Sequence, residues 1–125
     1  SREEMDDEQE IAEYKPEPVQ IMRRELRRAI ALKPGFTESY RLLAFINLVT
    51  GEQLPEAVEL LRQGLKLSPG RPDLTFILAQ VYLRMKDTEA ARATLQQLIN
   101  SGANARLRAR AQTMLERLKT NGGSR

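Results

Sequence analysis

Residues 64–70 read GLKLSPG and residues 29–35 read AIALKPG, so similar stretches ending in Pro-Gly occur 35 positions apart. The similarity extends outward, because Leu26 aligns with Leu61 and Leu43 aligns with Leu78. A further copy follows at an offset of 34, in which the small and apolar positions of 57–65 return as Ala91, Leu95 and Ile99. A period of 34–35 residues over most of the chain predicts a repeat architecture.

Each repeat contains two stretches with helical spacing and signals that end them. Gly51 stops one stretch, Pro55 opens the next, Pro69-Gly70 closes it, and Asp87 is a candidate cap for a later helix. No segment alternates with a period of two, so the predicted class is all-α. We expect six helices, at roughly 19–33, 38–50, 55–67, 73–85, 88–100 and 105–119. Short linkers favour antiparallel hairpins that bury their apolar faces by stacking, with the last helix as a cap.

These residues make the chain resemble the tetratricopeptide repeat (TPR) family, over about residues 19–119. The family's positions are matched in a leading half repeat, a first full repeat and a second full repeat. They are Met22, Leu26, Ala29 and Pro34; Tyr40, Leu43, Ala44, Ala57, Leu61, Gly64 and Pro69; and Leu78, Ala79, Tyr82, Ala91 and Leu95. Asn47 stands where the family has Tyr, and one extra residue enters the 51–56 turn. The resemblance implies a TPR-like α-solenoid.

The resemblance also implies a concave groove lined by the first helix of each repeat. In this register its residues are Glu38, Arg41, Phe45, Leu48, Val49, Asp73, Phe76, Gln80, Leu83 and Arg84. Phe45, Phe76, Leu48 and Leu83 would anchor a partner peptide or helix, and Arg41, Gln80 and Arg84 would fix its register. The alternative for Phe45 and Phe76 is packing against neighbouring helices or against a flanking repeat.

Some members of the family bind C-terminal carboxylates through a Lys/Asn/Arg clamp. In this sequence Phe45 and Gln80 stand where the clamp has Asn, and only Arg41 supplies the required charge. We therefore predict no carboxylate clamp.

Composition excludes several kinds of chemistry. The chain has no cysteine and no histidine, which removes thiol nucleophiles, histidine-based triads and the usual zinc sites. No glycine-rich phosphate loop or serine-hydrolase motif occurs, and no apolar run approaches the roughly 20 residues of a membrane span. We expect neither enzymatic activity nor a cofactor, metal or small-molecule substrate.

Charge is distributed unevenly along the chain. Residues 1–17 carry a net charge of −6 and the remainder carries +9. We interpret 1–17 as a mobile or linker segment, with an intramolecular contact to the basic residues 23–28 as the alternative. The candidate basic face consists of Arg23, Arg24, Arg27, Arg28, Arg106 and Arg110. It is either a solvated surface or a polyanion-binding one, and the lack of interleaved aromatic residues disfavours nucleic acid.

The prediction is therefore a non-catalytic protein–protein interaction module, with a repeat domain at 18–119 and a disordered tail at 120–125. The alternatives are polyanion binding through helices 19–33 and 105–119, and an auxiliary docking domain of a larger enzyme. Because the leading half repeat exposes a helix face, we also expect that two chains can dimerise by end stacking.

Overall fold

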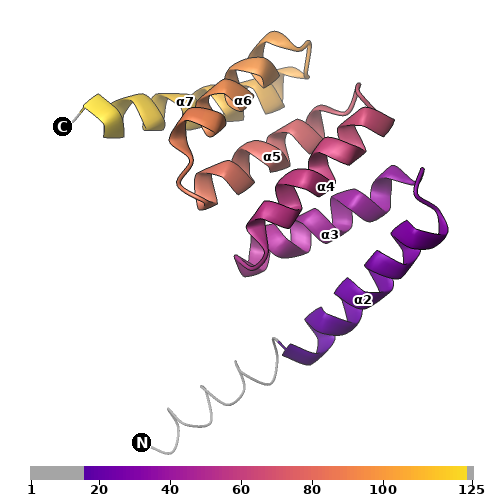
Figure 1. The fold of residues 1–125 in the computed structure, drawn as a ribbon. Helices are drawn as coiled ribbons and strands as arrows, with labels where there is room; N and C mark the ends of the chain where they lie inside the picture. Colours follow the sequence, from indigo (N-terminus) through magenta and orange to yellow (C-terminus); the bar gives the residue numbers. More distant parts are fainter. Residues whose placement is uncertain (1–15, 124–125) are drawn as a thin grey trace, which may run out of the picture.

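A computed structural model describes residues 16–123, and every element in that range is a helix. The helices are α2 (Pro16–Leu32), α3 (Thr37–Thr50), α4 (Leu54–Leu67), α5 (Pro72–Arg84), α6 (Thr88–Asn100) and α7 (Ala105–Gly123). They follow one another as antiparallel neighbours, from α2 at one end of the array to α7 at the other (Figure 1). This arrangement confirms the predicted all-α solenoid of antiparallel helical hairpins.

The turns between helices use the residues that the sequence offers for them. Gly51 adopts φ 73° at the end of α3, and its N–H donates to the carbonyl of Asn47 at 2.9 Å. Pro55 and Pro72 lie in the first turns of α4 and α5, where no intrahelical N–H is needed. Asp87 caps α6 by accepting a hydrogen bond from the N–H of Ala90 at 3.2 Å.

The core runs between successive hairpins as two connected clusters. The first is centred on α3, α4 and α5, and the second joins α5 to α6 and α7. Small residues occupy the close crossings, since Ala44, Ala57, Ala79 and Ala91 are fully buried. At Gly64, an added methyl group would already touch Leu74 Cδ1 at 3.4 Å, so α4 has little room to spare there.

Two helix ends lie a few residues from the predicted positions. α2 begins at Pro16 rather than at residue 19, because prolines in a first turn remove only N–H groups that lack a helical partner anyway. α7 continues to Gly123, so 120–123 are helical and not a disordered tail. The predictions for 1–15 and 124–125 lie outside the described residues.

Candidate functional site

The first helices of the hairpins, α3, α5 and α7, line one side of the array. α3 and α5 contact each other directly, whereas α4 and α6 share no comparable contact within residues 16–123. α7 reaches α5 through Ala111 and Leu115, which pack with Phe76. Helices that approach on one side and separate on the other curve an array toward the closer side. We call the exposed side of α3, α5 and α7, away from α4 and α6, the inner face.

Large apolar side chains are exposed along α3. Leu42, Phe45 and Val49 follow i, i+3, i+7 spacing; Phe45 is 45% exposed and Val49 is 60% exposed. Leu48 lies at their edge and is partly buried against the first core cluster. Leu42 was not among the predicted residues of the inner face, although it is 39% exposed. Its spacing from Phe45 and Val49 is the signal that could have assigned it to the exposed side.

Phe76 does not project from the inner face as an anchor. It is 6% exposed and packs with Leu95 and Leu115 in the second core cluster. The guanidinium carbon of Arg110 lies 4.6 Å from the centroid of its ring. The expectation of an exposed Phe76 is wrong because α7 covers α5 as the first helix of another repeat would. Packing against neighbouring helices, the alternative interpretation, is correct for Phe76.

Glu38, Arg41, Arg71 and Asp73 form an ion network that joins the first turns of α3 and α5. Arg41 donates two hydrogen bonds of 2.8 Å to Glu38, and Arg71 donates to Asp73 at 3.0 and 2.8 Å and to Glu38 at 3.3 Å. The hydrogen bond from Arg41 lowers the pKa of Glu38, and that from Arg71 lowers the pKa of Asp73. Sequence reasoning missed Arg71, which precedes α5 and so lies outside the helical register.

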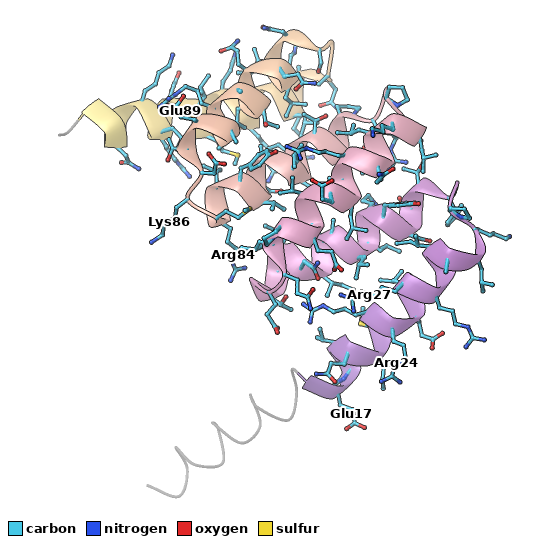
Figure 2. The ribbon with its side chains drawn as sticks, viewed as in Figure 1. Glu17, Arg24, Arg27, Arg84, Lys86 and Glu89 are labelled. Carbon is cyan, nitrogen blue, oxygen red and sulfur yellow. The ribbon has the colours of Figure 1, made fainter. Side chains whose placement is uncertain are left out.

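Arg84 is held at the end of α3 rather than left free. Its Nη1 donates to the carbonyl oxygens of Leu48 and Val49, the latter at 2.9 Å. These are unpaired carbonyls of the last turn of α3, and Figure 2 shows Arg84 beside that end. Gly51 leaves the space, because a Cβ there would lie 2.6 Å from Arg84 Nη2. The remaining predicted residues of the inner face, Gln80 and Leu83, are half-buried.

Arg23 is not part of an exposed basic face, contrary to the prediction. It is 6% exposed and donates to Asn47 Oδ1 at 3.1 Å and to Thr50 Oγ1 at 2.9 Å. Asn47 in turn donates to the carbonyl of Gln53 at 3.2 Å and to Glu56 Oε1 at 2.9 Å. This buried network holds the turn that contains the extra residue, and it explains why Asn occupies the position where the family has Tyr.

The other predicted basic residues divide into paired and exposed ones. Arg27 donates to both carboxylate oxygens of Glu56 at 3.0 Å, and Figure 2 shows it directed from α2 toward α4. Arg24 and Arg28 are exposed, as is Arg106 on α7. The basic face is therefore discontinuous, because half of the predicted cluster on α2 holds the fold together.

Within residues 16–123, no group of three or more His, Cys, Asp or Glu side chains is placed to hold a metal ion. No helix in this range is long and apolar enough to cross a membrane. The dimer by end stacking stays a prediction; Ile21 and Met22 on α2 are half-exposed at that end.

Paired helices, a 34–35-residue period and a curved array of first helices define a solenoid-type helical repeat protein. A family model described as "Tetratricopeptide repeat" matches residues 48–118, more than half of the chain. The chain therefore belongs to the tetratricopeptide repeat family.

Solved structures with the same fold cover most of this chain. The crystal structure of PcrH in complex with the chaperone binding region of PopD is 16% identical, with 98% of this chain and 96% of that chain covered and a TM-score of 0.75. A type III secretion complex from Aeromonas hydrophila is 20% identical, with coverages of 92% and 79% and a TM-score of 0.76. The Yersinia enterocolitica type III secretion translocator chaperone SycD is 17% identical, with coverages of 98% and 88% and a TM-score of 0.76. A comparison with curated protein sequences gives no match.

Proposed function

We propose that this chain is a protein-interaction module that holds a peptide or helix of a partner protein against its inner face. The observation that carries the proposal is the stripe of Leu42, Phe45 and Val49, exposed on one side of α3. Single exposed apolar residues are ordinary, whereas a contiguous stripe on a concave surface is typical of a binding site. The i, i+3, i+7 spacing suits an extended or helical apolar segment lying along α3.

The neighbouring residues support a division of roles within this surface. Phe45 is the aromatic anchor, and Leu42, Leu48 and Val49 surround it with apolar contact area. Gln80 adds an amide whose donor and acceptor can reach the backbone of a bound segment. Arg41 and Arg84 hold the inner face in shape and are less available to a partner, because their guanidinium groups already bind Glu38 and the end of α3, respectively.

The structural similarity to PcrH gives independent support. That structure contains the chaperone binding region of PopD, so a protein of the same fold and almost the same span holds a segment of another protein. For this chain the similarity supports binding of a protein segment and leaves the identity of the partner to experiment.

The test selects ligands without assuming the partner. A phage-displayed library of random peptides is panned on the intact chain, and the enriched peptides are measured by fluorescence anisotropy. Phe45→Glu should weaken binding by about tenfold or more, because it places a charge in a contact that must lose its water.

Phe36→Glu is the matched control, since Phe36 is also exposed but precedes α3, away from the stripe. It should leave binding and helical circular dichroism unchanged. Equal binding by the unmodified chain and Phe45→Glu would overturn the proposed site.

A further inference from the structure

Most of the positive charge on the inner face that is not already bound by other groups of the protein lies on the last helix, α7. The α7 segment 105–121 contains five basic residues and one acidic residue, Glu116. Arg110 and Arg117 are seven positions apart and therefore lie on the same side of α7, separated by roughly 10 Å. They line a depression of about 440 Å³ together with Ala109, Thr113 and Met114.

The two arginines differ from the other cations of the inner face. Arg41 and Arg71 are paired with Glu38 and Asp73, and Arg84 is bound to carbonyls of α3. Arg110 and Arg117 form no ion pair with a described residue between 17 and 121. Their charge is therefore available to an external group.

Arg110 is also held ready for a ligand. Its guanidinium lies over the ring of Phe76, 4.6 Å from the centroid, and that ring is fixed by the core. A guanidinium positioned in this way loses little freedom when it pairs with a carboxylate through two parallel hydrogen bonds. Met114, between Arg110 and Arg117 in the same depression, supplies apolar contact.

We infer that the bound partner segment is an acidic and apolar peptide, with carboxylates that pair with Arg110 and Arg117 and apolar side chains that contact the α3 stripe. This inference rests on the proposed function and adds the partner's chemistry and its direction across the inner face. The apolar end of the peptide lies on α3 and its acidic end on α7, because the exposed apolar residues are on α3 and the two arginines are on α7. Nucleic acid fits less well, since Phe76 is buried and the depression offers no exposed aromatic ring for base stacking.

The experiment uses the intact chain and a phage-displayed random peptide library. Three proteins are panned in parallel: the unmodified chain, Arg110→Gln/Arg117→Gln, and Arg108→Gln/Lys119→Gln. The third removes the same charge from the same helix, at two residues that do not line the depression. Selected peptides are then measured by fluorescence anisotropy at moderate salt, beside a copy with each Glu and Asp replaced by Gln and Asn and beside a single-stranded oligonucleotide.

The expected result is enrichment of peptides that combine acidic and apolar residues, with about tenfold or greater loss of affinity in Arg110→Gln/Arg117→Gln. The control pair should bind like the unmodified chain. Phe45-dependent binding of peptides without acidic enrichment would overturn this inference and leave the proposed function standing. No enriched peptide would overturn both. Oligonucleotide binding that depends on Arg110 and Arg117 and exceeds peptide binding would replace the peptide with a nucleic acid.

Discussion

Arg23 and Asn47 form a buried hydrogen bond of 3.1 Å that ties α2 to α3 across the end of the repeat array. Asn47 is completely buried, and its amide nitrogen bonds Gln53 and Glu56 on the other side. One side chain thus links the leading half repeat, the first helix of the next repeat and the enlarged turn between α3 and α4. α2 depends on this link because its only extensive contact among the described helices is with α3.

Replacing Arg23 should therefore destabilise the fold. In Arg23→Gln the side chain no longer reaches Thr50, and Asn47 loses a buried partner, so we expect about 2–4 kcal/mol less free energy of unfolding by urea denaturation. Arg24→Gln, on the exposed neighbour, should change it by less than about 0.5 kcal/mol. Addition of Asn47→Ala to Arg23→Gln should cost less than Asn47→Ala alone. Full additivity of the two losses would show that the residues are not coupled.

Gly51 should resist substitution for two separable reasons. Gly51→Ala places a Cβ at φ 73° and within 2.6 Å of Arg84 Nη2, whereas Gly102→Ala meets only the strain of φ 65° with nothing within 4 Å. We expect thermal unfolding to show a loss of about 1 kcal/mol for Gly102→Ala and a larger loss for Gly51→Ala. In an Arg84→Ala background, the cost of Gly51→Ala should fall to that of Gly102→Ala. An unchanged cost in that background would contradict the steric explanation.

The ion network should make stability depend on pH in the acidic range. Because the pKa values of Glu38 and Asp73 are lowered in the folded state, from ordinary values of 4.5 and 3.8, the unfolded chain takes up protons first as the pH falls. The stability from these two groups is present above about pH 5 and is lost as the pH falls through the folded-state pKa values. In Arg71→Gln the acid-induced loss should be smaller, as measured by urea titrations from pH 6 to pH 3. Identical pH profiles for the two proteins would argue against a role for Arg71.

Phe45 and Phe76 were both predicted as groove anchors, but replacing them should affect the free energy of unfolding very differently. Phe76→Ala should lower the free energy of unfolding by about 3 kcal/mol or more, because it opens a cavity between α5, α6 and α7. Phe45→Ala should lower it by less than about 1 kcal/mol, because that ring is half exposed. Chemical denaturation followed by circular dichroism measures both. Similar losses for the two variants would mean that Phe45 belongs to the core.

The repeat period was enough to predict the fold, because small and apolar residues recur wherever helices cross. The close packing of helices at Ala44, Gly64 and Ala79 follows directly from that recurrence. The inner face was only partly predictable. Phe45 and Val49 are exposed as expected. On α5, however, the exposure of a residue depends on how α7 packs over it, and the repeat period alone does not predict that contact.

Charged residues were the least predictable part. Arg23 and Arg24 are adjacent and chemically identical, yet one is buried against Asn47 and the other is exposed. The difference arises from helix rotation and from a polar partner more than 20 positions away. The departure from the family at Asn47 was the available signal, because a buried amide requires hydrogen-bond partners.

The most direct test of the central claim is contact between a bound peptide and Phe45. A photo-reactive benzoylphenylalanine is placed at position 45 in one protein and at position 36 in another, and each is irradiated with the peptide selected on the unmodified chain. The account predicts a cross-linked product, identified by mass spectrometry, from position 45 and none from position 36. Cross-linking from position 36 alone, or from neither position while the peptide remains bound, would contradict binding at the inner face.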